Sequence, residues 1–108
     1  MSLLLKQVVP VALLCLSSSF VAFAQGSPAD IYKAKCQMCH GADGLGATPA
    51  GKAMKARAFN SAEVLKESDA ELIAVVKNGK AKMPAYTGKI SDGDIKELVA
   101  YIHTLQKK

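Results

Sequence analysis

The chain has 108 residues, a formal net charge of +5 and 50% apolar residues. This length allows one domain, and it excludes a two-domain enzyme and any barrel or doubly wound sheet of ordinary size. The chain has no tryptophan, three tyrosines and three phenylalanines. Aromatic side chains normally supply much of the core of a small protein, so we expect something else to fill part of this one.

The first 24 residues predict an export signal, and 17 of them are apolar. Lys6 precedes an apolar stretch over residues 8–16, serines follow it, and Ala22-Phe23-Ala24 is a small-x-small cleavage pattern. This is the arrangement of a secretory signal peptide. We therefore expect cleavage after Ala24 and a periplasmic or otherwise exported domain of 84 residues, 25–108, with a charge of +4.

Two alternatives exist for this segment. An uncleaved membrane anchor needs about 20 apolar residues, but Pro10 and three serines interrupt the stretch. The lipoprotein pattern places a small residue before a lipidated cysteine, but Leu14 precedes Cys15. Cleavage is therefore favoured, and Cys15 leaves with the peptide. Cys36 and Cys39 remain in the exported chain, in a compartment expected to be oxidising.

Helix signals begin soon after the export segment. Ser27 is a good N-cap with Pro28 at the first helical position, which predicts a helix from Pro28 to about Cys39. Ser91 is expected to cap a final helix, because apolar residues recur after it at helical spacing. These residues are Ile95, Leu98, Val99, Ile102 and Leu105.

Shorter helices are expected between these two. One of them is expected over residues 61–66. Another is expected after Ser68, because Ser68 and Glu71 can form a capping box, and it should stop at Asn78-Gly79. No segment alternates like a β-strand. The chain is therefore predicted to be all-α, with three or four helices.

Two long segments, 41–60 and 80–90, carry glycine and proline and are predicted to be loops. They are too long for a minimal helical bundle. A mature chain of 84 residues with few aromatic side chains also buries little surface by itself. A large, planar, apolar cofactor wrapped by the loops would explain both observations.

The chemistry is carried by Cys36-Gln37-Met38-Cys39-His40. The pattern C-x-x-C-H is the attachment signature of a c-type haem. Positions i, i+3 and i+4 share one face of a helix, so Cys36 and Cys39 can reach the two vinyl groups of one porphyrin. His40 then lies where it can coordinate the iron.

Two other uses of these cysteines are possible from their spacing. A redox-active disulfide of the thioredoxin type needs a βαβ context, and no strand is predicted. A structural zinc site needs four ligands, and only His40 and His103 are left to supply the rest. Haem attachment is therefore the favoured interpretation.

A haem iron in an electron carrier needs a sixth ligand, and four side chains are candidates: Met38, Met54, Met83 and His103. Met38 is expected to point away from the haem face. Met83 lies in a loop that Pro84 can stiffen, and it is favoured as the ligand. Met54 packing at the haem edge and His103 at the flank of the last helix remain alternatives.

Together these residues resemble the class I cytochromes c, most closely the small soluble monohaem members of bacteria and algae. The resemblance covers nearly all of residues 26–108. It is carried by the C-x-x-C-H motif, by Asn78-Gly79 followed by Met83-Pro84-Ala85-Tyr86, and by Leu98-Val99-Ala100-Tyr101-Ile102.

The resemblance implies helices wrapped around one covalently attached haem, with the first and last helices crossing. It implies that His40 and Met83 are the axial ligands and that the carbonyl of Pro49 accepts the His40 ring N–H. Tyr32 and Tyr101 match the aromatic positions at the crossing. One departure is Pro28, where family members often have glycine.

These features predict a one-electron carrier and not an enzyme, because an iron with His and Met ligands is saturated and changes oxidation state with little rearrangement. The alternative is an enzyme or sensor in which Met83 dissociates and the iron binds a small ligand. His103 is the only spare histidine for such chemistry.

The placement of charge suggests how the carrier would dock. No acidic residue lies between Asp43 and Glu63 or between Glu71 and Asp92, and these intervals hold seven basic residues: Lys52, Lys55, Arg57, Lys77, Lys80, Lys82 and Lys89. We expect redox partners with an acidic docking surface, no nucleic-acid partner, at most peripheral contact with membrane complexes, and a monomer. A merely solvated basic surface is the alternative. Arg57 or Lys55 is also a candidate partner for a haem propionate.

Overall fold

The computed structural model describes residues 26–107, so the predicted signal peptide at 1–24 lies outside the described residues. Six helical segments follow one another in the described part of the chain. They are α1 (Pro28–Lys35), α2 (Gln37–His40), α3 (Pro49–Met54), α4 (Ala62–Leu65), α5 (Asp69–Asn78) and α6 (Asp92–Gln106). Between residues 26 and 107, β-structure occurs only as two isolated bridges, so the predicted all-α class is confirmed.

Side-chain caps fix where most of these helices begin. The N-cap hydroxyl of five helices accepts a hydrogen bond from the backbone N–H three residues further on, and these caps are Ser27, Thr48, Ser61, Ser68 and Ser91. Such bonds satisfy amide groups that have no partner within the helix. Ser68 also forms the predicted capping box with Glu71.

Two helical boundaries differ from the sequence-based expectation. The helix predicted from Pro28 to about Cys39 is two helices, because the chain turns at Cys36, where φ is −119°. The loop predicted over 41–60 contains α3, for which Thr48 is the N-cap and Pro49 the first residue. The shorter helices at α4 and α5, and the loop over 80–90, are as predicted.

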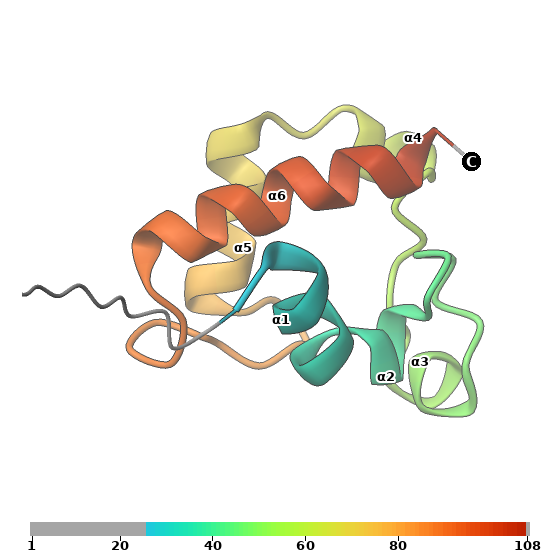
Figure 1. The fold of residues 1–108 in the computed structure, drawn as a ribbon. Helices are drawn as coiled ribbons and strands as arrows, with labels where there is room; N and C mark the ends of the chain where they lie inside the picture. Colours follow the sequence, from blue (N-terminus) through green and yellow to red (C-terminus); the bar gives the residue numbers. More distant parts are fainter. Residues whose placement is uncertain (1–25, 108) are drawn as a thin grey trace, which may run out of the picture.

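The long helix α6 lies across both α1 and α5 (Figure 1). Its buried stripe consists of Ile95, Leu98, Val99, Ile102 and Leu105, as predicted. At the α1–α6 crossing the rings of Tyr32 and Tyr101 lie 5.2 Å apart. The crossing therefore forms with Pro28 at the start of α1. Among residues 26–107, no helix is both long and apolar enough to cross a membrane.

Candidate functional site

The two cysteines and the histidine of the C-x-x-C-H motif meet at one cavity. Cys36 forms the turn between α1 and α2, and Cys39 and His40 end α2. Both cysteines are free thiols and partly buried. All three side chains line a cavity of about 290 Å³ that also receives Met83.

The cavity lies between α1, α2, the end of α3, α5, α6 and the segment 80–86. Its apolar lining comes from residues far apart in the sequence, among them Phe59, Val64, Leu72, Val76, Leu98 and Ile102. The sequence-predicted loops therefore do enclose a shared apolar space. Such a space with a few convergent polar groups is the usual form of a cofactor site.

Hydrogen bonds to backbone carbonyls hold the chain on both sides of His40. The buried Tyr32 hydroxyl donates to Gly41 O at 2.5 Å, and the Gly46 N–H donates to His40 O at 2.8 Å. The Thr48 hydroxyl lies 2.6 Å from Met38 O and 3.1 Å from Cys39 O. These contacts join α1 and the start of α3 to the motif.

Glycine is required where α3 and the following loop pack against the motif. A Cβ at Gly51 would collide with the carbonyl of Cys39, so α3 could not lie against α2 with any larger residue there. Gly46 has a φ of 69°, and a Cβ there would lie 2.7 Å from Ala56 O. The segment before Arg57 therefore lies directly on the turn that follows His40.

The His40 ring is oriented by a carbonyl and an aromatic ring. Its Nδ1 lies 3.3 Å from Arg57 O, and its ring stacks on Phe59 at 4.6 Å with an interplanar angle of 27°. A carbonyl can only accept, so Nδ1 donates and the lone pair is on Nε2, which suits metal ligation. Burial lowers the pKa of His40, which favours the neutral form that binds metals.

The family resemblance implies that the carbonyl of Pro49 accepts the His40 ring N–H. In the structure the carbonyl at this ring is a different one. Pro49 is the first residue of α3, where its fixed φ and missing N–H suit a helix start. The hydrogen-bonding position is taken by Arg57, 17 residues after His40. We therefore assign the accepting role to Arg57. A backbone carbonyl has no signature in the sequence that could have identified it.

Met83 is held at the cavity by a short hairpin. Lys80 N–H donates to Met83 O at 3.2 Å, and Met83 N–H donates to Lys80 O at 2.9 Å. A Cβ at Gly79 would lie 2.7 Å from Met83 O, so glycine permits the close return of the chain. Tyr86 fixes the chain after the hairpin, because its hydroxyl donates to Lys35 O at 3.1 Å.

The other candidate ligands lie in different environments. Met54 lines the same cavity and is 43% exposed, whereas Met83 is partly buried against the core. Met38 is 78% exposed and does not line the cavity. His103 lies outside the cavity, and its two ring nitrogens lie 2.6 Å from Asp69 Oδ1 and 2.7 Å from Gln106 Oε1.

The alternative uses of the cysteines find no support in this geometry. Burial raises the pKa of Cys36 to about 11, whereas a redox-active dithiol depends on a lowered thiol pKa. Within residues 26–107, no group of three or more His, Cys, Asp or Glu side chains is arranged to hold a metal ion. The apolar cavity, the paired thiols and the oriented imidazole instead fit a covalently held porphyrin.

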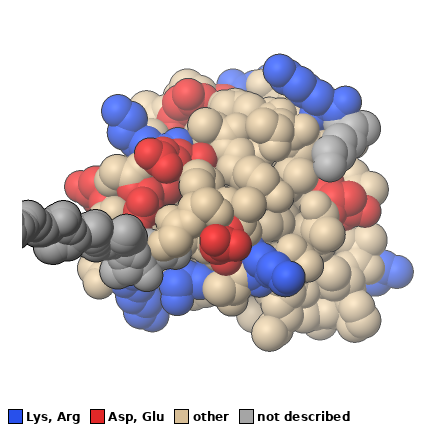
Figure 2. Space-filling view, viewed as in Figure 1, with Lys and Arg blue, Asp and Glu red and all other residues tan. Residues whose placement is uncertain are grey.

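The charged residues that line the cavity are basic. Among residues 26–107, five cationic side chains and no carboxylates line it: Lys35, Lys55, Arg57, Lys80 and Lys82. The face on which α1 and α6 lie differs, because it carries both acidic and basic side chains around a largely uncharged middle (Figure 2). Four of the seven basic residues in the two acid-free intervals therefore line the cavity: Lys55, Arg57, Lys80 and Lys82.

Comparisons with known proteins agree with this site. The family described as "Cytochrome C oxidase, cbb3-type, subunit III" matches residues 24–102. A cytochrome c6 of Picosynechococcus sp. is 32% identical over 91% of this chain and 92% of its own length. The solved structure of the KustC0563 c-type cytochrome has a TM-score of 0.68 and 29% identity, covering 74% of this chain and 98% of that one.

One relative is much longer. The cbb3-type cytochrome c oxidase subunit CcoP of Azospirillum brasilense is 32% identical over 69% of this chain, but the match spans only 26% of that protein. The similarity therefore concerns one domain of CcoP and does not transfer the activity of the oxidase.

The fold and the C-x-x-C-H cavity define a small monohaem cytochrome of the c type. The chain belongs to the cytochrome c family, in the group whose description names subunit III of cbb3-type oxidases. Its cofactor is one covalently bound haem c, and it is a haem-based electron carrier.

Proposed function

We propose that this cytochrome is an exported one-electron shuttle, not an enzyme, with His40 and Met83 as the axial ligands of its haem iron. The observation that carries the proposal is that both side chains line the same apolar cavity as Cys36 and Cys39. The thiols of these cysteines would form the two thioether bonds. The mature domain would comprise residues 25–108 after cleavage of the segment 1–24.

The residues around the cavity suit electron transfer. The bound haem supplies an iron that accepts and releases one electron. The neutral His40 imidazole, held by Arg57 O, would bind through Nε2, and the soft thioether of Met83 favours the ferrous state and raises the potential. The apolar lining excludes water and disfavours the additional charge of the ferric state.

An enzyme or sensor would need a group that activates a small ligand at the sixth position. Within the described residues, no carboxylate and no histidine other than His40 lines the cavity. His103, the alternative base, is held by Asp69 and Gln106 away from it. The residues present therefore favour the carrier.

Spectroscopy and mass measurement of the exported protein test the proposal. We expect a low-spin ferric spectrum with a weak far-red band from methionine ligation, and a mass equal to residues 25–108 plus one haem. A high-spin ferric spectrum, or ready carbon monoxide binding by the reduced protein, would overturn the assignment of Met83 and with it the carrier function.

We further propose that this carrier docks through the rim of its cavity onto an acidic surface of its redox partners. The cationic lining supports this, above all Lys35, Lys55 and Lys82, which lie outside the ion pairs that Arg57 and Lys80 make with Glu67. Like-signed charge around a cleft steers oppositely charged partners. The rate of electron transfer to such a partner should fall as salt is added. A rate independent of ionic strength would contradict this docking mode.

A further inference from the structure

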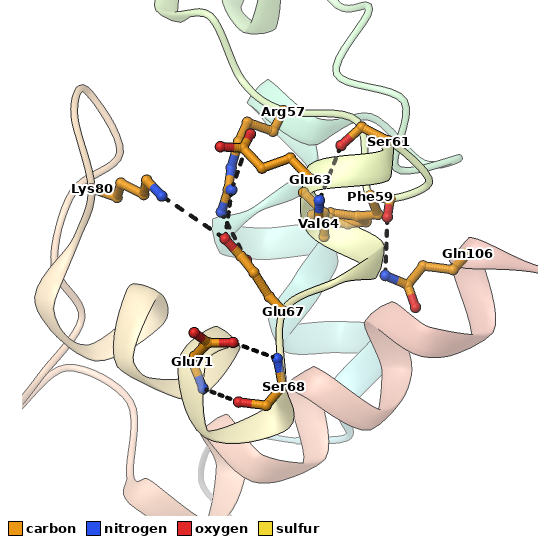
Figure 3. Close-up of polar contacts among 10 residues, drawn as sticks. All are labelled: Arg57, Phe59, Ser61, Glu63, Val64, Glu67, Ser68, Glu71, Lys80 and Gln106. Atoms are coloured by element: carbon orange, nitrogen blue, oxygen red, sulfur yellow. Dashed lines mark hydrogen bonds and ion pairs between the residues drawn. The ribbon is translucent and has the colours of Figure 1, made fainter.

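Figure 3 shows a bidentate ion pair between Arg57, which lines the cavity, and Glu67. Arg57 Nη1 lies 2.8 Å from Glu67 Oε2, and Arg57 Nη2 lies 3.2 Å from Glu67 Oε1. The two side chains are 24% and 15% exposed. Paired, charge-assisted hydrogen bonds in a partly buried place fix orientation more strongly than a surface ion pair does.

Two further charged groups lie near this pair, and they differ in which partner they contact and in how exposed they are. Lys80 Nζ lies 3.8 Å from Glu67 Oε2. Glu63 Oε1 lies 3.4 Å from Arg57 Nη1, but the Glu63 side chain is 63% exposed. Glu67 is therefore the shared centre of the cluster, and Glu63 is a peripheral member.

Arg57 connects this cluster to the proposed axial histidine. The backbone carbonyl of Arg57 faces His40 Nδ1, while its guanidinium binds Glu67. On either side, Ala56 N–H donates to Gly51 O and Phe59 N–H donates to Gly44 O, each at 2.8 Å. These two bonds attach the segment to the first half of the chain, whereas the guanidinium attaches it to the connection between α4 and α5.

Lys80 connects the same carboxylate to the proposed axial methionine. The backbone of Lys80 exchanges two hydrogen bonds with Met83. Its side chain reaches Glu67 across the edge of the cavity. Glu67 thus contacts one cationic residue whose backbone holds His40, Arg57, and one whose backbone holds Met83, Lys80.

We propose that Glu67, through Arg57 and Lys80, is a positioning residue that sets the two axial ligands relative to each other. The ion pair with Arg57 keeps the Arg57 carbonyl at the His40 ring N–H, and the contact with Lys80 restrains the Met83 hairpin. This inference rests on the proposed ligation by His40 and Met83. In agreement with it, the Arg57 guanidinium lowers the pKa of Glu67, so the carboxylate is charged at neutral pH.

Glu67→Gln in the holoprotein is the principal test, with Glu63→Gln as the matched control. Each variant removes one carboxylate near Arg57 and retains the side-chain size. For Glu67→Gln we expect the His40 ring N–H to exchange with solvent about tenfold faster, as for a lost hydrogen bond to a charged group. The reduction potential should rise, because a weaker hydrogen bond makes the imidazole a poorer donor to ferric iron. The Glu63→Gln variant should retain the wild-type exchange rate.

A charge-balanced variant separates positioning from simple electrostatics. Arg57→Gln combined with Glu67→Gln restores the net charge of the wild type and retains the backbone carbonyl of residue 57. We expect this double variant to keep the faster exchange and the raised potential. A wild-type exchange rate and potential in the double variant would overturn the proposal, because charge alone would then account for Glu67→Gln.

Lys80→Gln tests the contact between Glu67 and the Met83 hairpin separately. If Glu67→Gln does not fold with haem, Lys80→Gln provides a milder test, in which the far-red methionine band should be lost at lower temperature than in the wild type. An unchanged band would overturn the Met83 part of the proposal. A wild-type protein without that band would refute Met83 ligation itself, whereas the His40 exchange rate would still decide the part that concerns Arg57.

Discussion

The two segments that carry the proposed axial ligands are built differently. The chain around His40 is partly buried and is held by hydrogen bonds from Tyr32, Gly46 and Thr48, and the buried Gly51 packs directly against it. The chain around Met83 is a hairpin at the surface, and most of residues 80–89 are exposed. Local stability depends on buried contacts and protected hydrogen bonds, so the histidine side should be the more rigid and the methionine side the first to open.

The Met83 hairpin also contains a strained residue. Ala81 has a φ of 53°, a conformation that costs a residue with a Cβ about 1–2 kcal/mol. The first central position of such two-residue turns normally favours glycine. The hairpin therefore combines few buried contacts with an unfavourable backbone angle, and the following predictions test the contrast with the His40 side.

The largest effect is expected from Met83→Ala. Loss of the thioether should abolish the far-red band, allow carbon monoxide to bind the reduced protein and lower the potential by roughly 100–200 mV, or two to three factors of ten at 59 mV each. Redox titration and optical spectra measure these changes. Met54→Ala serves as the control, since it also lines the cavity and should leave the band in place.

A smaller but clear difference is expected between two tyrosines. Tyr32→Phe removes a buried hydrogen bond to Gly41 O and should lower the free energy of unfolding by about 1–2 kcal/mol. Tyr86→Phe removes an exposed bond to Lys35 O and should cost less than about 0.5 kcal/mol. Denaturant titration of both variants measures the difference. Equal losses would show that the two segments are not held differently.

His103 should give the stability a pH dependence unrelated to the haem ligands. Hydrogen bonds with Gln106 and Asp69 raise its pKa above 6.5 in the folded protein. Its contribution is therefore complete below pH 6.5 and is lost as the pH rises through the folded value. The side chain is 39% exposed, so solvent screening limits the effect to about 0.5 kcal/mol. Unfolding curves of the wild type and His103→Gln, compared across this range, should converge at high pH.

The smallest effect is expected from Ala81→Gly. Relief of the positive φ is partly offset by the greater freedom of glycine in the unfolded chain, leaving a gain of about 0.5 kcal/mol. Thermal unfolding measures the gain, and the far-red band should persist to higher temperature. Gly88→Ala is the opposite control, because Gly88 has a φ of 83° and a Cβ there would be strained. If Ala81→Gly were instead less stable than the wild type, backbone strain at Ala81 would not be what makes the hairpin open first.

Helix starts were predictable because capping is local. Ser27, Ser68 and Ser91 each lie next to the helix that they cap, and all three were identified from neighbouring residues. The same reasoning missed α3, although Thr48 followed by Pro49 repeats the pattern of Ser27 followed by Pro28. The abundance of glycine and alanine in residues 41–60 concealed this signal. The break at Cys36 could not be anticipated, since helical spacing alone favoured one continuous helix.

The choice among candidate ligands depended on tertiary structure to different degrees. Spacing was sufficient to single out Cys36, Cys39 and His40 for the proposed attachment and ligation, because the C-x-x-C-H pattern lies within about one helical turn. The loop sequence already favoured Met83 over His103 as the proposed ligand, and the fold agrees with this preference, since Met83 lines the cavity and His103 is bound to Asp69 outside it.

The sequence by itself determined the class of cofactor and most of the helix starts, since both follow from contacts between residues a few positions apart. Tertiary structure decided what surrounds His40. The carbonyl at its ring belongs to Arg57 rather than Pro49, and the guanidinium of that same residue is held by Glu67. These partners lie 17 and 10 residues apart. Contacts over such distances depend on how the whole chain encloses the cavity, and no local pattern of residues encodes them.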